Sequence, residues 1–477
     1  MNTFARKMTL LALTAVFALM AYGYHPAHAA SEVTWFIGLG TGAQKEQLDI
    51  EKSIADKFNA SQSDIHLTLN IAASNAAAPG LLSALIGSGR SPDIVGPVGY
   101  AGSNAFPGQW MDLASLVKKN NYNLAQFPDA LVKLYQAPEG LLGLPFAVYP
   151  SLLFYNKDLF DEATLAYPPT KVGDTYKLDG KDVPWDWNTV AEIGKRLTVD
   201  AAGNDATSAK FDPKNIVQYG FNQQWGTTRA DFSTFGGSPV VDPTTKKVVI
   251  PQSWRDNAQW TWDGIWKYHF IPTATAEASK LLQPSAFSSG KVAMSRVPLW
   301  YTCCMDSMKA KWDLAVEPSY KGNTYSPTDA DTFRISKDTK NPDASFKVLA
   351  YLLGDAANDL LTTYGAYPAR TDLQAVSIKS KADKFPSVKN WSIVAPSLAY
   401  AAVPHHESAY PNFNKGQLRF ADFRTLLYGD TGSSMDVKAE LDKLQSDVQA
   451  IVSAPEAGLP PTNTPEPPPT AAATAAK

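Results

Sequence analysis

Near the N-terminus, hydrophobic residues alternate between strand-like and helix-like spacing. Residues 33–37 form a short apolar run, and the apolar positions of 65–71 alternate with polar ones, as in a strand with one buried face. Between them, Ile50, Ile54 and Phe58 recur at four-residue spacing, which is typical of one helix face. The order predicts strand, helix and strand.

The next segments extend the same alternation. Thr41 and Gln44 precede the first helix and fit a capping box, in which Thr41 accepts a backbone N–H and Gln44 reaches back. Pro79 suits the first turn of a second helix, over residues 81–86, and residues 92–95 read as a third strand. A β-α-β-α-β order predicts an α/β protein with a parallel sheet and helices on its faces.

Later segments continue in both patterns. The expected strands and helices are strand 151–155, helix 188–197, helix 254–268, strand 292–294, helix 343–353 and helix 437–452, with a polar surface excursion at 168–184. The helix at 254–268 carries four tryptophans, which we expect to pack in the core because they recur at helical spacing.

Both ends differ from the rest of the chain. Arg6 and Lys7 precede an apolar run of about 15 residues, and Ala27 and Ala29 provide a small-x-small cleavage pattern, so residues 1–29 are expected to be a signal peptide. Residues 454–477 consist mainly of Pro, Thr and Ala, a composition that cannot bury a core and predicts a disordered tail.

Length and composition narrow the functional classes. A chain of 477 residues is too long for one compact core, which favours at least two domains. Lys plus Arg (43) nearly balance Asp plus Glu (46), so a nucleic-acid-binding surface is not expected. Two cysteines exclude a disulfide scaffold and a cysteine-based zinc module.

A glycine-rich loop follows the first strand. Residues 38–43 fit G-x-G-x-x-A, but the second strand does not end in the acidic residue that would hold a dinucleotide ribose. We therefore expect no cofactor. The glycines instead let a ligand approach the helix N-terminus near Thr41 and Gly42, where free N–H groups donate.

Catalytic and metal-binding patterns are weak. The chain has no HExxH and no G-x-S-x-G, and no motif points to a pair of glycosidase carboxylates. His405, His406 and Glu407 could bind a metal, although a solvated loop is the favoured interpretation. The sequence predicts neither a metal site nor an enzyme.

Six motifs in order resemble the extracellular solute-binding proteins of ABC importers, specifically the sugar-binding, maltose-binding-protein-like cluster. The motifs, which span about 340 residues, are Trp35-Phe36-Ile37, Gly89 to Val95, Gly143 to Pro150 running into Leu153 to Phe160, Trp187-Asn188-Thr189-Val190, Phe287 to Met294 before Trp300, and Ile335 to Ala344 leading to Tyr367-Pro368-Ala369-Arg370. Each motif alone is unspecific, and their shared order carries the resemblance.

The resemblance implies a periplasmic-binding-protein-like fold of two α/β lobes with a ligand cleft between them. Three hinge crossovers are expected near Pro145, Pro318 and Gly365. Lobe one would comprise residues 30–145 and 316–365, and lobe two residues 146–315 and 366–453. Hinge closure would then enclose the ligand.

By the same resemblance, the protein would capture a mono- or oligosaccharide and deliver it to ABC permease subunits in the membrane. We expect an exported monomer, periplasmic or extracellular and not lipid-anchored, because no cysteine lies near the cleavage site. Two alternatives stay open. One is a secreted carbohydrate-active hydrolase. The other is a binding protein for a non-sugar solute such as a polyamine, a phosphate ester or a peptide.

Sugar binding needs flat apolar faces and a polar rim. The expected aromatic contacts are Tyr100, Tyr149, Trp225, Trp300, Tyr301 and Tyr367. Trp300 is favoured because it matches a family position that stacks on sugar. The expected polar contacts are Asn75, Asn222, Gln224, Asp329, Asp331 and Arg370. Core packing or a solvated loop is the alternative for each.

Departures from the family pattern concern the ligand. Val297-Pro298-Leu299-Trp300 replaces the usual Gly-Pro-Trp, and Arg296 is unusual there and makes an anionic ligand conceivable. Cys303 and Cys304 are adjacent. Their Cα atoms, about 3.8 Å apart across a trans peptide, are closer than the usual disulfide range, so a vicinal disulfide and two buried thiols both stay open.

Overall fold

The computed structural model describes residues 30–99, 102–403, 405, 408–456 and 458–459. The predicted signal peptide and most of the predicted tail lie outside the described residues. Within the described residues, no helix has the length and apolar character needed to cross a membrane.

One large mixed sheet runs through the molecule. Its strand order is β2-β1-β3-β15-β6-β11-β10-β9, and β12 and β16 also pair with β6. The strands are β1 (Ser31–Ile37), β2 (Ile65–Ile71), β3 (Ile94–Val98), β6 (Leu144–Asn156), β9 (Val199–Asp200), β10 (Ile216–Gln223), β11 (Val292–Pro298), β12 (Trp312–Ala315), β15 (Thr328–Ile335) and β16 (Tyr367–Pro368). Strand β1 pairs with β2 and β3 in parallel, as the β-α-β-α-β pattern predicts.

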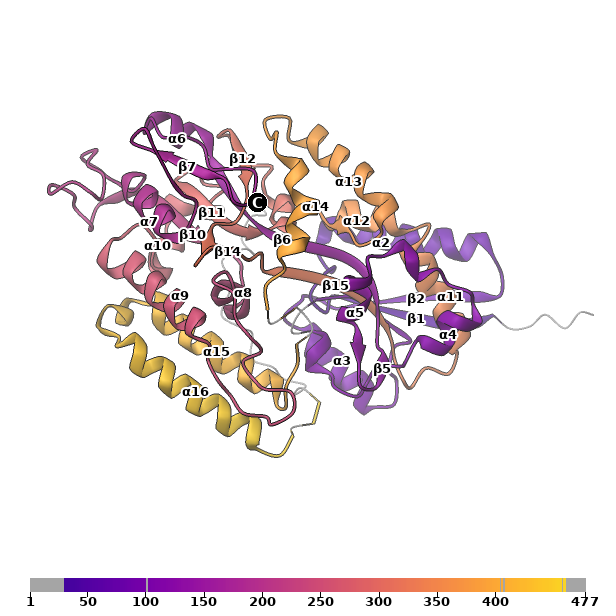
Figure 1. Ribbon diagram of the computed structural model, residues 1–477. Helices are drawn as coiled ribbons and strands as arrows, with labels where there is room; N and C mark the ends of the chain where they lie inside the picture. The colour runs from indigo at the N-terminus through magenta and orange to yellow at the C-terminus, as the bar shows by residue number, and fades with distance from the viewer. Residues whose placement is uncertain (1–29, 100–101, 404, 406–407, 457, 460–477) are drawn as a thin grey trace, which may run out of the picture.

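Strand β6 joins the two halves of this sheet. All thirteen of its residues are buried. Residues 144–150 pair with β15, whereas residues 151–156 pair with β11 and β12. The exchange of partners falls at Pro150 and Ser151, slightly beyond Pro145. Figure 1 shows β6 and β15 crossing the middle of the molecule, between the indigo half and the magenta half.

We call the two halves lobe one, with β2, β1, β3, β15 and residues 144–150 of β6, and lobe two, with residues 151–156 of β6 and β9 to β12. The helices associated with lobe one are α2 (Lys45–Ser61), α3 (Ala78–Gly87), α4 (Ala114–Lys119), α5 (Asp129–Leu134), α11 (Pro342–Leu353) and α12 (Ala357–Thr363). The two-stranded β4 (Gln136–Ala137) and β5 (Gly140–Leu141) lie beside α5 in Figure 1.

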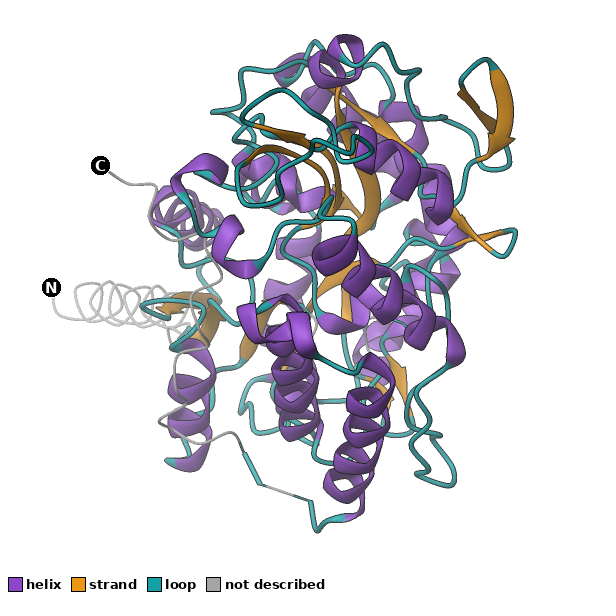
Figure 2. Cartoon of the chain, turned by 90° about the vertical axis from the view of Figure 1, so that its left-hand side faces the viewer, coloured by secondary structure: helices purple, strands orange, loops and turns teal. Residues whose placement is uncertain are grey.

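Most remaining helices belong to lobe two. They are α6 (Lys157–Glu162), α7 (Trp187–Arg196), α8 (Thr228–Ser233), α9 (Gln252–Trp262), α10 (Ala274–Glu277), α13 (Thr371–Lys384), α14 (Val394–Ser397), α15 (Phe413–Tyr428) and α16 (Val437–Ser453). Two further hairpins are β7–β8 (Thr175–Leu178 and Lys181–Pro184) and β13–β14 (Ser319–Tyr320 and Asn323–Thr324). Figure 2 shows helices over both halves of the molecule, with strands between them.

Each lobe has its own apolar core. The largest cluster lies mainly in lobe two and includes Phe154, Phe221 and Leu444. Two clusters lie on lobe one, one containing Trp35 and Phe146 and another containing Phe36 and Phe106. Because adjacent strand residues point to opposite faces, Trp35 and Phe36 fill different cores. The residue ranges expected for the two lobes from the sequence, 30–145 with 316–365 and 146–315 with 366–453, stay a prediction.

The sequence pattern places most elements within a few residues, with two corrections. The predicted capping box at Thr41 and Gln44 is wrong: the Gln44 backbone N–H donates to the Gln47 side chain at 3.1 Å, and α2 begins at Lys45. The helix predicted over 254–268 is divided in the structure: the α-helix α9 ends at Trp262, and a single π turn follows at Asp263–Lys267. Its tryptophans pack against the core of lobe two, as expected.

The first prediction concerns the contact between α7 and β10. A β-carbon on Gly220 would lie 2.0 Å from the carbonyl oxygen of Gly194, which no backbone can accommodate unshifted. We expect Gly220→Ala to lower the free energy of unfolding by about 1–3 kcal/mol or more, since overpacking forces the backbone apart. Denaturant unfolding of the variant and the parent protein measures this loss of stability.

Gly87→Ala is the matched control, because nothing lies within 4 Å of a β-carbon at the end of α3. Its stability is expected to stay unchanged or rise by up to about 1 kcal/mol. Equal effects of the two substitutions would contradict the α7–β10 packing.

Candidate functional site

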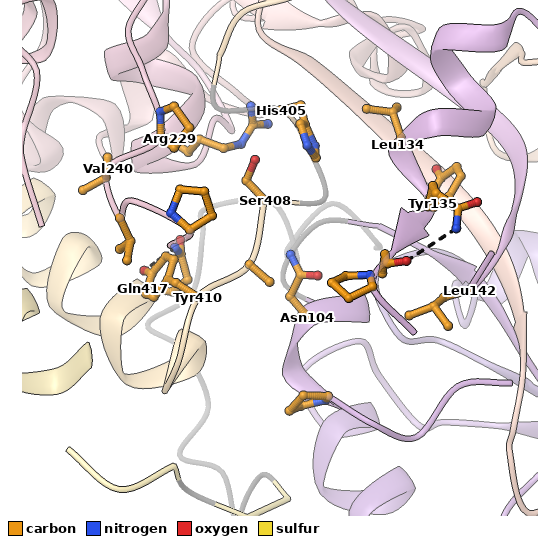
Figure 3. A pocket seen from close by; sticks show the side chains of 18 of the residues that line it. Asn104, Leu134, Tyr135, Leu142, Arg229, Val240, His405, Ser408, Tyr410 and Gln417 are labelled. Carbon is orange, nitrogen blue, oxygen red and sulfur yellow. Dashed lines mark hydrogen bonds between the residues drawn. The ribbon is translucent and has the colours of Figure 1, made fainter. Parts of the chain in front are cut away.

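A cavity of about 510 Å³ lies between the two lobes. Lobe one contributes residues of 104–110 and 134–142 together with Arg334, and lobe two contributes Arg229 and residues of 239–254 and 403–420. Figure 3 shows Tyr410 and Gln417 on one side of the cavity and Tyr135 and Leu142 on the other. The size suits a small ligand held by groups from both sides.

Arg334 forms part of the lobe-one wall. It lies on β15, and its guanidinium is 5.6 Å from the ring centre of Trp110 and 5.7 Å from that of Tyr135. Its Nη1 donates to the carbonyl oxygen of Leu142 at 2.9 Å. These contacts fix a cation between two aromatic rings at the cavity surface.

Arg229 forms part of the opposite wall. It lies in α8, where the Thr227 side chain caps the helix by accepting from the Ala230 N–H. Its Nη2 is 2.5 Å from Oδ1 of Asp329, and both side chains are largely buried. Because Asp329 belongs to β15, this ion pair ties lobe two to the strand that crosses from lobe one.

Tyr410 presents an aromatic ring from the C-terminal part of lobe two. Its hydroxyl accepts from the Gln417 Nε2 at 2.9 Å. Gly416 leaves room for the ring, since a β-carbon there would lie 2.6 Å from the tyrosine hydroxyl oxygen. The residues of α15 therefore hold Tyr410 in place at the cavity rim.

Three of the residues predicted to bind ligand meet at Asp331. Its Oδ2 accepts from the Thr41 hydroxyl at 2.8 Å and from the Tyr149 hydroxyl at 3.0 Å. Burial raises the pKa of Tyr149 well above its ordinary value, and the Asp331 charge adds to this shift. Asp329 and Asp331 lie inside β15, so the sheet fixes both side chains in position.

The glycine loop is held by internal contacts. Gly42 has φ +86°, and a β-carbon there would lie 2.3 Å from the Ile37 side chain. In the amide orientation that satisfies both of its polar atoms, the Asn75 nitrogen donates to the carbonyl oxygens of Gly38 and Gly42 at 3.0 and 2.9 Å. Asn75 therefore ties the segment after β2 to this loop.

Three predicted aromatic contacts form a cluster of their own. The rings of Trp225 and Trp300 stack with centres 5.6 Å apart and an interplanar angle of 6°, and Tyr301 meets Trp225 edge-on at 4.9 Å. Trp300 and Tyr301 lie in a 3₁₀ helix, η5 (Leu299–Cys304). Tyr301 is fully buried, with its hydroxyl 2.7 Å from both Ser285 Oγ and Ser288 Oγ.

Other predicted contacts have partners inside the protein. Asn222 donates to Glu277 at 3.2 Å, and the Gln224 side-chain oxygen accepts from the Phe287 N–H at 3.0 Å. Tyr367 is buried in the lobe-two core. Arg370 bonds to Asp372 and to the Leu353 carbonyl oxygen. Tyr100 lies outside the described residues.

None of the predicted contacts that the structure describes lines the large cavity. The cavity residues that sequence reasoning missed are Trp110, Tyr135, Arg229, Arg334, Tyr410 and Gln417. Arg229 lies four residues beyond Trp225, which is one of the contacts predicted from the sequence. His405, which the sequence analysis placed in a solvated loop, also lines the cavity. No sequence motif marked the remaining cavity residues.

Comparison with known proteins identifies the family. The family model described as bacterial extracellular solute-binding protein matches residues 42–359, about two thirds of the chain. The chain belongs to this family of solute-binding proteins. The resemblance found in the sequence is thereby confirmed.

Curated relatives of this solute-binding protein include a glycerol-phosphate receptor. The sn-glycerol-3-phosphate-binding periplasmic protein UgpB of Brucella suis is 29% identical over 308 residues, which cover 61% of this chain and 62% of the relative. UgpB of Agrobacterium fabrum is 29% identical over 228 residues, covering 44% and 48%. The match thus spans less than two thirds of the length of these relatives.

Solved structures support the two-lobe fold. The ABC substrate-binding protein Lmo0181 of Listeria monocytogenes, in complex with cycloalternan, superposes with a TM-score of 0.67 at 19% identity, covering 88% of this chain and 98% of the other. Maltose-bound MalE3 of T. maritima gives 0.62 at 16% identity, covering 88% and 100%. At these identities the likeness shows the fold alone.

Buried charges connect the lobe-two half of this solute-binding protein to β6. Arg296 on β11 is fully buried and pairs with Asp231 of α8. It also donates to Gln223 Oε1 at 3.1 Å and to Ser151 Oγ at 3.2 Å. Arg424 of α15 donates to the second Asp231 oxygen at 2.8 Å. Each of the three guanidinium nitrogens of Arg296 therefore has a partner inside the protein.

Glu317 provides the second prediction. It is buried beside this network, and neither carboxylate oxygen has a hydrogen-bond partner among the described residues. Burial raises the pKa of Glu317 to about 8, against the opposing charge of Arg296. The folded protein therefore holds the proton more tightly than the unfolded chain. The stability linked to that proton is complete below the ordinary glutamate pKa and is lost as the pH rises through 8.

We expect Glu317→Gln to gain stability relative to the parent protein between pH 5 and pH 8, by at most about 1.4 kcal/mol per pH unit. Denaturant unfolding at the two pH values measures the difference. Asp359→Asn, which alters an exposed ion pair with Lys57, is the control and should change by less than about 1 kcal/mol at either pH. If the difference in stability between Glu317→Gln and the parent protein were the same at pH 5 and pH 8, the raised pKa of Glu317 would be contradicted.

Proposed function

We propose that this protein is the substrate-binding component of an ABC-type sugar importer. It captures a mono- or oligosaccharide in the cavity between the lobes and delivers it to permease subunits in the membrane. In this role it is exported and monomeric, acts outside the cytoplasmic membrane, and binds its ligand without converting it.

The observation that carries the proposal is the composition of the cavity. Tyr135 on lobe one faces Tyr410 on lobe two across it, as Figure 3 shows, and Trp110 also lines the lobe-one wall. Asn104, Gln417 and Arg229 supply polar groups around them. Flat aromatic faces suit the C–H surfaces of a sugar ring, and the polar groups suit its hydroxyls. Both named structural relatives carry a carbohydrate, which agrees with this composition.

Ligand binding would favour closure of the lobes. A ligand shifts an open–closed equilibrium only by its preference for one state, and a sugar that touches both Tyr135 and Tyr410 gains contacts only when the lobes are together. The exchange of partners in β6 at Ser151 is a place where the lobes could pivot.

A second candidate ligand is a phosphorylated polyol. Arg229 and Arg334 line the cavity, and guanidinium groups bind phosphate in a two-pronged geometry. The curated relatives named above bind glycerol 3-phosphate. Sugar is preferred because Asp329 neutralises Arg229 and two aromatic rings enclose Arg334.

The third prediction is the result of a thermal-shift screen of the purified protein. Maltose, longer maltooligosaccharides, common monosaccharides, glycerol and glycerol 3-phosphate form the panel. A saturating sugar at 100 times its Kd should stabilise the fold by about 2.7 kcal/mol, which raises the Tm visibly. A shift with glycerol 3-phosphate alone would favour the second candidate, and no shift with any ligand would overturn both.

The fourth prediction locates the bound sugar. We expect Tyr410→Ala to weaken binding at least about tenfold, equivalent to about 1.4 kcal/mol, while the exposed Tyr268→Ala leaves it unchanged. Trp300→Ala tests the site expected from the sequence. Binding that survives Tyr410→Ala but is lost in Trp300→Ala would move the sugar to the Trp225–Trp300 pair.

A further inference from the structure

Two adjacent thiols end the 3₁₀ helix η5. Cys303 and Cys304 are free, and both are exposed. The same short helix begins at Leu299 and carries Trp300, which stacks on Trp225. A chemical change at the two thiols would therefore act on the segment that positions this aromatic pair.

The end of η5 also contacts the connection that follows α12. A β-carbon on Gly365 would lie 3.3 Å from the β-carbon of Cys303, so the two residues are in direct contact. The Lys381 ammonium donates to the Gly365 carbonyl oxygen at 2.8 Å and to the Thr302 hydroxyl at 3.4 Å. Gly365 is where the third crossover between the lobes is expected, and η5 packs against it.

Further hydrogen bonds keep η5 in its present shape. The Thr302 hydroxyl donates to the Leu299 carbonyl oxygen at 3.0 Å. The Ser288 hydroxyl donates to the Cys304 carbonyl oxygen at 3.1 Å. The backbone at Cys303 and Cys304 is thus held from two directions, by Ser288 and by the Lys381–Thr302 contact.

We propose that Cys303 and Cys304 are a redox-active dithiol that closes to a vicinal disulfide by exchange with an external disulfide, and that closure loosens η5 from Gly365. The thiolate of Cys304 attacks one sulfur of the external disulfide, forms a mixed disulfide and releases one thiolate, which takes up a proton. The thiolate of Cys303 then attacks the Cys304 sulfur and releases the second thiol. Two thiols of the protein are oxidised, and one disulfide of the reagent is reduced to two thiols.

Two features favour this order of steps. A hydrogen bond with the Cys303 thiol lowers the pKa of the Cys304 thiol, while burial and the Asp306 charge oppose the shift and the Lys384 ammonium supports it. Cys304 therefore carries more thiolate, the attacking form. The Cys303 thiol has the higher pKa and stays protonated until the second step.

Ring closure and the present shape of η5 exclude each other. Adjacent Cα atoms are about 3.8 Å apart across a trans peptide, below the usual range of about 4.4–6.8 Å for a disulfide. The peptide between Cys303 and Cys304 must therefore leave its helical geometry when the sulfurs join. The contacts of Ser288 with Cys304 and of Cys303 with Gly365 change with it.

The covalent step is tested by incubating the reduced protein with oxidised glutathione and measuring intact mass and free thiols. The parent protein should lose two hydrogens, both titratable thiols should disappear, and no glutathione should stay attached. Cys303→Ser, which cannot close the ring, should instead keep one glutathione on Cys304. Parent protein that retains glutathione, or keeps both thiols titratable, would overturn the proposal.

The structural step is tested by hydrogen exchange of the oxidised and reduced protein. Amides of 299–306 and of 363–367 should exchange at least about tenfold faster after oxidation, and those of β1 should not change. Cys304→Ser, which lacks the attacking thiol, is treated in the same way as the control and should show no difference. A ring that forms without faster exchange at these two segments would contradict the link between the dithiol and Gly365.

Discussion

One fully buried strand determines how the rest of this molecule is arranged. The thirteen residues of β6 pair with lobe one up to Pro150 and with lobe two from Ser151 onward. Every backbone N–H and C=O of a buried strand needs a partner, so the two half-sheets cannot separate without breaking β6. The lobes can therefore move only about this strand and the strands paired with it, and the cavity of the candidate site lies between them.

Charged residues fix the lobe-two side of this arrangement. Asp231 is shared by Arg296 and Arg424, and Arg296 reaches Ser151 at the point where β6 changes partners. Removing one member of a buried ion pair leaves an uncompensated charge, which costs about 3–5 kcal/mol. The Arg229–Asp329 pair is similar but bridges the lobes, so it links the cavity wall to the crossing strand.

Local pattern predicts local structure well in this chain. Apolar spacing located β1, α2 and β2, and α7, α11 and α16 lie within one residue of their predicted ends. The strand predicted at 151–155 is the second part of β6, but the pairing of β6 with both half-sheets could not be predicted, because an apolar run does not show which strands it pairs with. Thr41 illustrates the same limit for the site: its hydroxyl bonds to Asp331, 290 positions away, and not to the first turn of α2. Cavity residues such as Tyr410 and Arg334 come together only in the fold.

We infer that the cavity between Tyr135 and Tyr410 holds the ligand. A crystal structure of the protein with the compound that gives the largest thermal shift tests it most directly. We expect ligand density in contact with Trp110 or Tyr135 on one side and with Tyr410 or Arg229 on the other. Density outside this cavity, for example on the Trp225–Trp300 pair, would contradict it.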